Sequence, residues 1–209
     1  MILNLEKLQE EYGFDIRGVI HIGAHHGEEC VVYKKMGITS LLLFEPVPES
    51  FGVLKNNVRR IFDDDSIRVG VVNMALGNYN GKATMHIASN DGISSSLLDP
   101  LYHRIQYPPI RFNDTLEVDI VKLDDYLGSC TEFNFISIDV QGYELEVFKG
   151  ATETLESIDC IIAEVNMVEL YKGCVEVAEL DSFLGGYGFE RVETNWTEIT
   201  WGDALYIKK

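Results

Sequence analysis

The sequence lacks several features that mark common classes of protein. None of its apolar runs is long enough to span a bilayer. Its four cysteines include no C-x-x-C pair, so their spacing does not resemble a zinc site. Basic residues are scarce, since 17 Lys and Arg stand against 34 Asp and Glu, a formal net charge of −17. This charge argues against non-specific binding to nucleic acid or to an anionic membrane, and we expect neither partner.

Linkers, repeats and low-complexity segments are also missing from the 209 residues. We therefore expect one globular domain over residues 1–209, with a hydrophobic content of 46% that suits such a domain. Residues 1–17 hold a predicted amphipathic helix closed by Gly13 and carry acids unlike a signal peptide. We expect a cytoplasmic protein with reduced cysteines. The sequence does not indicate an oligomeric state.

The clearest functional pattern is GVIHIGAHHGEE at residues 18–29. A short apolar strand runs into a small-residue turn at 23–27, a helix follows, and a second apolar strand at 41–44 ends on Glu45. This order of strand, glycine turn, helix, strand and acid is typical of a nucleoside-cofactor site. Small residues let the backbone approach the ligand, and a carboxylate at the second strand tip can accept hydrogen bonds from ribose hydroxyls.

The glycine spacing indicates which cofactor binds. A dinucleotide fingerprint needs G-x-G-x-x-G, but His25 and Glu28 take the places of its second and third glycines. A pyrophosphate would meet a side chain and a negative charge there. S-adenosylmethionine suits the turn better, because it has no phosphate and carries a sulfonium cation. An NAD(P)-dependent reductase is the weaker alternative.

Three histidines, His21, His25 and His26, cluster at this turn beside Glu28 and Glu29. Histidines next to an acid can bind a metal ion. A strand that leads into a turn, however, is not expected to bring these side chains to one face, as H-E-x-x-H on a helix does. We therefore predict no metal site at the turn.

Further strands end in polar residues along the chain. A predicted strand at 67–72 leads to residues 73–75, a buried strand at 133–138 ends on Asp139, and Glu164 lies near the tip of a strand at 158–165. In an open α/β sheet, ligands bind outside the carboxyl ends of the strands. Periodicity predicts the remaining elements as helices at 28–36, 48–62, 123–127, 143–149 and 175–184, and as strands at 83–88, 116–121, 190–194 and 204–209.

Residues 89–114 have no clear periodicity but contain three prolines and several aromatic residues. A loop of this length in a compact domain is either functional or disordered. We interpret it as a candidate substrate lid, with Ser95, Tyr102, His103 and Arg104 as candidate substrate residues. An ordinary surface loop is the alternative. Glu164, outside this loop, is a further candidate substrate residue.

Seven segments in order resemble the FkbM-type methyltransferases: GVIHIGAHHGEE, FEPVP, NMALG, SSSL, VKLDDYL, FISIDVQGYELEVFKGA and IIAEV. The resemblance runs over about residues 18–189, and DVQGYELEVFKGA is its most specific part. It implies the class I methyltransferase fold, an α/β three-layer sandwich. The seven-stranded sheet of this fold is mostly parallel, with one antiparallel strand near the C-terminus. The implied activity is S-adenosylmethionine-dependent O-methylation of a hydroxyl on a sugar, glycan or small natural product.

The resemblance also implies which residues lie around the cofactor. The predicted cofactor-binding set is His21, Gly23, Ala24, His25, Gly27, Glu28, Glu45, Pro46, Asn73, Met74, Ala75 and Asp139. One departure concerns His21 and His25, where the family usually has Asp and Asn. The Asp often supports the glycine turn and the cofactor amino group, and Glu28 is a candidate to supply the missing charge.

A hydroxyl nucleophile benefits from losing its proton to a nearby base. Asp139 is the first candidate for this base, Glu144 the second, and Glu164 and His103 follow. Asp139 has alternative roles, since it can hold the cofactor amino group or cap the following helix. Asp139 and Glu164 also permit a divalent ion without requiring one, so no metal cofactor is predicted.

Two other functions stay open. A degenerate domain that binds the cofactor without catalysis is the first, and the departure at His21 hints at it. A methyltransferase that acts on protein or nucleic acid is the second. The absence of a basic patch and of an N-P-P-Y-like element weighs against nucleic acid and amino-group substrates.

Overall fold

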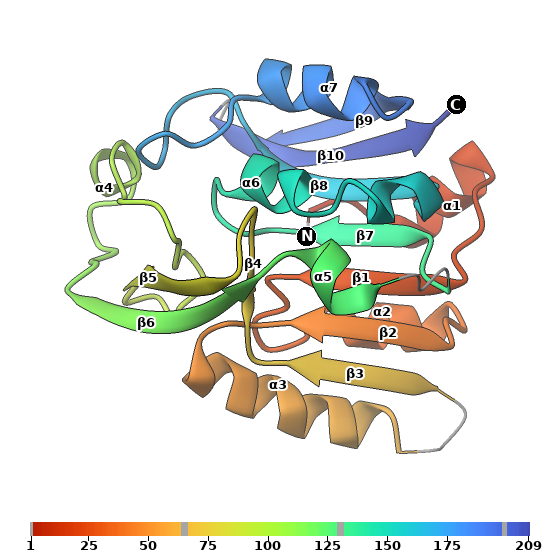
Figure 1. The fold of residues 1–209 in the computed structure, drawn as a ribbon, viewed down its shortest axis with the longest axis horizontal. Helices are drawn as coiled ribbons and strands as arrows, with labels where there is room; N and C mark the ends of the chain where they lie inside the picture. The colour runs from red at the N-terminus through yellow and green to blue at the C-terminus, as the bar shows by residue number, and fades with distance from the viewer. Residues whose placement is uncertain (1, 64–66, 129–131, 198–199) are drawn as a thin grey trace.

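The computed structural model describes residues 2–63, 67–128, 132–197 and 200–209. Its central sheet has seven strands: β1 (Gly18–Ile22), β2 (Ser40–Phe44), β3 (Arg68–Val72), β7 (Phe135–Ile138), β8 (Cys160–Asn166), β9 (Phe189–Thr197) and β10 (Trp201–Lys208). Their order is β3-β2-β1-β7-β8-β10-β9 (Figure 1). The first five strands pair in parallel, whereas β10 is antiparallel to both β8 and β9. The predicted fold, six parallel strands and one antiparallel strand near the C-terminus, is confirmed.

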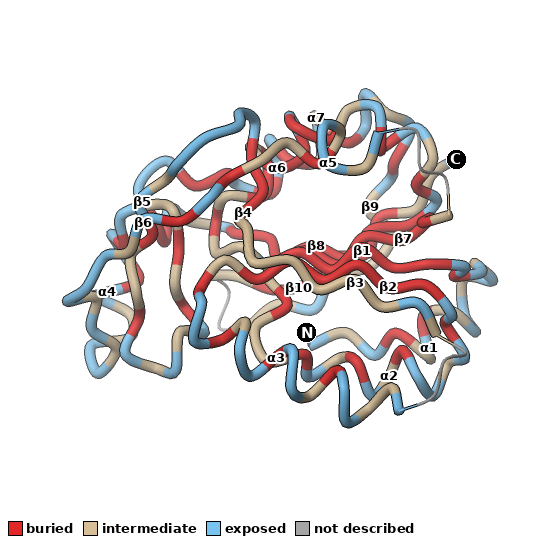
Figure 2. The backbone as a smooth tube through the Cα atoms, turned by 60° about the horizontal axis from the view of Figure 1, so that its bottom comes forward, coloured by how far each residue is buried: buried red, intermediate tan, exposed pale blue. Residues whose placement is uncertain are grey.

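Helices cover both faces of this sheet (Figure 2). One face carries α1 (Leu5–Tyr12), α2 (Cys30–Lys35) and α3 (Pro48–Ile61), and the other carries α5 (Leu123–Leu127), α6 (Glu144–Lys149) and α7 (Val177–Gly185). A 3-10 turn, η1 (Thr154–Ser157), precedes β8. Every residue of β1, β2, β7 and β8 is buried, as expected for apolar parallel strands covered on both faces. In the described part of the chain, no helix is both long and apolar enough to cross a lipid bilayer.

The two largest apolar clusters of the described residues lie on opposite faces of the central sheet. Val19 of β1 packs with Tyr33 and Leu54 on the side of α2 and α3, whereas Ile20 packs with Phe148 on the side of α6. This follows from the alternation of side chains along a strand. Burial of one such side chain stabilises the fold by about 1.5–3 kcal/mol, so the strand tips are held by a rigid support.

A second, smaller sheet was not predicted. It contains β4 (Ala75–Leu76), β5 (Gly81–Ile87) and β6 (Asp114–Val121), in the order β4-β6-β5, and lies beside the tips of the central strands (Figure 1). The strands expected at 83–88 and 116–121 exist, but they pair with each other and not with the central sheet. Periodicity shows that a segment is a strand without showing which strand will be its neighbour.

The segment between β5 and β6 corresponds to the predicted lid. It contains a short helix, α4 (His103–Gln106), and it folds back on the chain after β8. Pro100 forms an isolated bridge with Tyr171, and the backbone N–H groups of Leu101 and His103 both donate to the carbonyl of Leu170 at 3.0 Å. The segment is therefore a folded structure supported by residues 170–171.

Candidate functional site

A cavity of about 400 Å³ opens at the carboxyl ends of β1, β2 and β7. Many predicted site residues line it: His21, Gly23, Ala24, His25, Glu28, Glu45, Pro46, Met74, Ala75, Ser95 and Asp139. Other predicted residues of the described chain lie outside this lining: Gly27, Asn73, Tyr102, His103, Arg104, Glu144 and Glu164. The cavity thus occupies the position where open α/β sheets bind ligands.

The glycine turn brings three strand tips together. Gly23 has a φ of +79°, and a Cβ atom at this residue would lie 2.0 Å from the carbonyl oxygen of Asp139. The backbone N–H groups of Gly23 and Ala24 both donate to the carbonyl of Phe44, at 3.0 and 2.9 Å. Only glycine fits this left-handed turn and its close approach to a neighbouring backbone.

Glu45 lies at the tip of β2 and is only 5% exposed. Its Oε2 accepts a hydrogen bond from the backbone N–H of His25 at 2.9 Å, and its Oε1 accepts one from Val47 at 2.8 Å. Burial raises the pKa of the Glu45 carboxyl to about 7, although the two hydrogen bonds oppose this shift. The fold itself therefore orients this carboxylate.

Two predicted residues support the turn from behind the cavity. Gly27 has a φ of +78°, and a Cβ atom there would lie 2.7 Å from Cδ1 of Leu54, so this glycine permits packing against α3. The side-chain amide of Asn73 donates to the carbonyls of Glu45 and Pro46, at 2.9 and 3.0 Å. Asn73 thus fixes the chain that carries Glu45.

His21 is 4% exposed, and its Nδ1 lies 3.1 Å from the hydroxyl oxygen of Tyr33. Burial lowers the pKa of His21, while the charge of Glu29 acts in the opposite direction. The imidazole is therefore neutral at neutral pH. Glu29, which the sequence places beside these histidines but which we did not predict as a cofactor residue, lines the cavity as well. It follows Glu28 directly, and both acids border the cavity.

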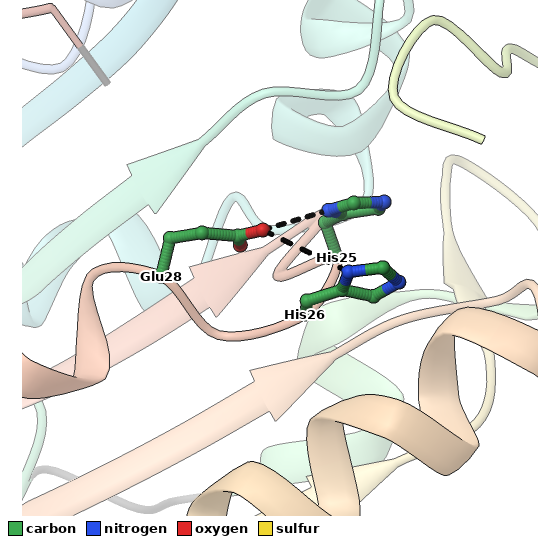
Figure 3. A group of neighbouring side chains, drawn as sticks. All are labelled: His25, His26 and Glu28. Carbon is green, nitrogen blue, oxygen red and sulfur yellow. Dashed lines mark hydrogen bonds and ion pairs between the residues drawn. The ribbon is translucent and has the colours of Figure 1, made fainter. Parts of the chain in front are cut away.

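His25 connects the glycine turn to the loop after β5 (Figure 3). Its Nδ1 lies 3.0 Å from Oε1 of Glu28, and its Nε2 lies 2.8 Å from the carbonyl oxygen of Asp91. Both partners only accept hydrogen bonds, so this geometry suits the doubly protonated ring. Burial lowers the pKa of His25, but the bonds to Asp91 and Glu28 outweigh it, and the pKa is raised overall.

Our geometric argument that the turn keeps its histidines apart was wrong. Possible ligand atoms of His25, His26 and Glu28 lie within 4.8 Å of one another (Figure 3). His25 has a φ of +45°, and this tight backbone stacks the two imidazoles, with ring centroids 3.8 Å apart and planes at 21°. The Nδ1 atoms of both rings face the same atom, Oε1 of Glu28, at 3.0 Å from His25 and 4.0 Å from His26. The cluster as it stands is a hydrogen-bonded group at the cavity rim.

The opposite side of the cavity is acidic. Asp139 is exposed at the end of β7, and Glu164 of β8 is 4% exposed beneath it. The amide nitrogen of Gln141 donates to Oδ1 of Asp139 at 2.8 Å and to Oε2 of Glu164 at 2.9 Å. Burial, and after it the charge of Asp139, raises the pKa of Glu164 well above its usual range. One amide thus bridges the two carboxyl groups, and oxygen atoms of Asp139, Glu144 and Glu164 lie within 4.8 Å of one another.

Glu144 supports this acidic side from within α6. It is fully buried, and its Oε1 accepts hydrogen bonds from the backbone N–H groups of Val140 and Gly142, at 3.0 and 3.2 Å. Burial raises the pKa of the Glu144 carboxyl to about 7. The side chain closes the turn after β7.

Of the predicted loop residues, Ser95 alone is among the residues that line the cavity. Its hydroxyl accepts a hydrogen bond from the backbone N–H of Ala88 at 3.1 Å. Tyr102 is 42% exposed, and Arg104 forms an exposed ion pair with Asp99 at 3.4 Å. These two side chains lie on the outer part of the loop.

His103 is 3% exposed and packs among aromatic rings, with centroids 5.3 Å from both Phe112 and Tyr171. Burial lowers the pKa of His103. The ring helps to hold α4 against the segment after β8.

Comparison with known families decides the class of protein. The sequence model described as the methyltransferase FkbM domain matches residues 21–191, which is most of the chain. The chain belongs to the FkbM methyltransferase family. The expected cofactor of this family member, S-adenosylmethionine, is thereby confirmed.

Individual proteins of known activity or structure are similar to this chain. The chain is 28% identical over 164 residues to the 2-O-methyltransferase NoeI of Sinorhizobium fredii, covering 74% of this chain and 65% of that relative. The magnesium protoporphyrin IX methyltransferase of Synechocystis, solved with bound S-adenosylmethionine, has a TM-score of 0.57 at 9% identity, covering 98% of this chain and 76% of that one. The ribosomal protein L11 methylase of Lactobacillus delbrueckii has a TM-score of 0.54 at 11% identity, covering 98% and 77%. These two structures share the fold of this chain.

Proposed function

We propose that this chain transfers a methyl group from S-adenosylmethionine to a hydroxyl of a sugar, glycan or small natural product. The observation that carries the proposal is one cavity with Glu45 fixed on one side and the exposed Asp139 on the other. Membership of the FkbM family and the likeness to a 2-O-methyltransferase support it. We treat the whole chain as a single catalytic domain.

The glycine-turn side of the cavity suits the cofactor. Glu45 offers a preoriented carboxylate for the ribose hydroxyls, and Met74 and Ala75 offer an apolar wall for the adenine. Gly23 and His25 border the remainder. When bound, S-adenosylmethionine supplies a methyl group on a positively charged sulfur atom, which the acidic side of the cavity attracts.

The acidic side suits the acceptor. Asp139 lines the cavity and is exposed, so it can hold the proton that an acceptor hydroxyl loses. Glu144 is committed to two backbone N–H groups, and we assign it a structural role. Ser95 is the candidate on the loop for contact with the acceptor.

Calorimetric titration tests the cofactor site. We expect S-adenosylmethionine to bind the wild type at micromolar concentration and Glu45→Ala to lose at least about tenfold in affinity, since a charged hydrogen bond contributes about 1.5–3 kcal/mol. Glu49→Ala, an exposed acid in the first turn of α3, is the matched control and should bind normally. Absence of binding to the folded wild type would contradict the proposal.

Formation of S-adenosylhomocysteine with a panel of methyl glycosides tests the acceptor class. Each hydroxyl is compared with its deoxy counterpart. We expect Asp139→Asn to bind the cofactor normally and to lose about 10²- to 10⁴-fold in turnover, the usual contribution of a general base. Cofactor binding without turnover of any acceptor would favour the degenerate binding domain.

A further inference from the structure

We propose that Gln141 is a positioning residue for the methyl transfer. Its side-chain amide holds Asp139 at the cavity and Glu164 beneath it in one arrangement, and its contacts tie both to the loop on the acceptor side. This inference rests on the proposed function, in which Asp139 receives the acceptor proton.

The backbone at Gln141 is unusual. Its φ is +55°, and Gly142 follows with a φ of +95°. A residue other than glycine in this region is strained, and such strain persists where surrounding contacts impose it. Here the carboxylate of Glu144 binds the N–H groups of Val140 and Gly142, and the hydroxyl of Ser96 donates to the carbonyl of Gln141 at 2.8 Å. The left-handed turn directs the amide across the acidic side of the cavity.

The orientation of the amide is determined by its partners. Its nitrogen uses both hydrogens, one for Asp139 and one for Glu164. Its oxygen Oε1 accepts a hydrogen bond from the fully buried hydroxyl of Tyr171 at 2.7 Å. A flipped amide would turn its oxygen towards the two carboxyl groups and leave Asp139 without this donor. One side chain therefore sets the geometry of both acids.

Acids dominate the surroundings of the Glu164 carboxyl. The charges that act most strongly on the Glu164 carboxyl are those of Asp139, Glu144 and Asp203. A glutamine can bind two carboxyl groups without adding a charge, whereas a glutamate at the same position would add one. Gln141 is thus suited to bring acids together near the cavity.

Titratable groups of other described elements also face this cluster, among them Tyr171, His21 and Cys174, whose thiol feels the charge of Glu144 and has a pKa raised mainly by burial. Tyr171 feels the charges of Glu164 and Asp139, and His21 of β1 feels the charge of Asp139. Burial raises the pKa of Tyr171 and lowers that of His21, so both are neutral around pH 7. The charge of the cluster between pH 6 and 8 therefore depends on its carboxyl groups.

The same network reaches the acceptor loop. The Tyr171 hydroxyl lies 2.9 Å from the carbonyl oxygen of Ser94 as well as 2.7 Å from Oε1 of Gln141, and the Ser96 hydroxyl binds the Gln141 carbonyl. Displacement of the loop at residues 94–96 would alter the support of the amide. Gln141 thereby connects the position of the loop at residues 94–96 to the position of the Asp139 carboxylate.

Proton release on cofactor binding tests this role without an acceptor. We would titrate S-adenosylmethionine into wild type, Gln141→Ala and Gln141→Glu between pH 6 and 8.5, in two buffers with different ionisation enthalpies. A cation bound beside carboxyl groups favours their ionised form, so protons leave in the pH range where the cluster titrates. S-adenosylhomocysteine, which lacks the charge on sulfur, serves as the matched ligand. Gln9→Ala in α1 serves as the matched variant.

We expect Gln141→Ala to bind S-adenosylmethionine within about threefold of wild type at pH 8.5, with the midpoint of proton release moved upward by about one pH unit. Gln141→Glu, which keeps the size of the side chain, should move the midpoint further because it adds an acid. Gln9→Ala should leave it unchanged. Identical midpoints in wild type and both Gln141 variants would overturn the inference while leaving the proposed function intact. Failure of the folded wild type to bind S-adenosylmethionine would remove both.

A second variant examines the link to the loop. Tyr171→Phe removes the donor to Oε1 of Gln141, so we expect a smaller upward shift of the same midpoint. In the double variant with Gln141→Ala, the two shifts should not add, because both changes act through one amide. Full additivity would contradict a shared path through Gln141.

Discussion

The two sides of the cavity hold their acids by different means. On the glycine-turn side, backbone N–H groups orient Glu45, so its position is fixed by the fold of β1 and β2. On the opposite side, a side chain, Gln141, orients Asp139 and Glu164. The orientation of Glu45 is kept as long as the strands pair. The orientation of Asp139 and Glu164 changes when the single side chain of Gln141 is replaced. We expect substitutions to affect the two sides differently.

Gly23→Ala should remove the difference between the two sides, because it displaces the glycine turn and the end of β7 together. The added Cβ would lie 2.0 Å from the carbonyl oxygen of Asp139, and the φ of +79° is strained for alanine. We expect a loss of about 4 kcal/mol in the free energy of unfolding, at the upper end for single substitutions. Urea denaturation measures it. Gly37→Ala is the control, since its φ is +73° and no heavy atom of the described residues lies within 4 Å of the new Cβ. It should cost only about 1–2 kcal/mol.

Glu144→Gln tests the acidic side of the cavity through the pH dependence of the free energy of unfolding. The pKa of Glu144 is raised to about 7 in the folded protein, so the native state binds more protons than the unfolded state from about pH 4.5 to 7. Its contribution to stability is therefore present at low pH and is lost as the pH rises through 7. The free energy of unfolding of the variant, minus that of the wild type, should therefore rise by about 2 kcal/mol from pH 5 to pH 8. A constant difference between the two proteins across this range would contradict the buried, protonated carboxyl.

Glu45→Gln tests the glycine-turn side by the affinity for S-adenosylmethionine. The pKa of Glu45 is about 7, and its ionised form accepts hydrogen bonds best. The affinity of the wild type should therefore rise between pH 6 and 8, while that of the variant should stay flat and be about tenfold weaker at pH 8. Calorimetry at three pH values measures both. A variant that keeps the pH dependence of the wild type would assign this dependence to another group.

His25→Gln should give the smallest effect. The raised pKa of His25 means that its bonds to Glu28 and the Asp91 carbonyl are strongest at low pH and weaken as the pH rises through that pKa. Because Glu28 is largely exposed, we expect a contribution of only about 0.5 kcal/mol. Amide hydrogen exchange of residues 89–95 should be faster in the variant at pH 6 and similar to wild type at pH 8. His86→Gln in β5 is the control.

The sequence predicted the central sheet and the strand tips well, because both follow from local patterns. The apolar runs at 41–44 and 133–138 are buried strands, and Glu45 and Asp139 lie at their ends beside the cavity. The second sheet could not be predicted in this way. Its strands are half exposed, and their pairing depends on contacts between segments that periodicity does not relate.

The loop and Gln141 show a different limit. His103 was selected for its chemistry, yet it is buried among aromatic rings, because a segment without periodicity does not reveal which side chains turn inward. Gln141 was missed because its role depends on a left-handed backbone and on Tyr171, 30 residues further along the chain. Such contacts become visible only in three dimensions.

The pairing of β5 with β6 has a consequence for how the specificity for a methyl acceptor changes during evolution. β5 and β6 are joined by seven register pairs, from Gly81 with Ile120 to Ile87 with Asp114. The loop at 88–113 connects the two residues of the last pair. Closing a loop twice as long between fixed ends costs only about 0.6 kcal/mol more. Evolution, or a protein engineer, can therefore replace residues between the ends of this ladder at little cost in stability, but a replacement that keeps the cofactor site must preserve the contacts to His25 and Gln141.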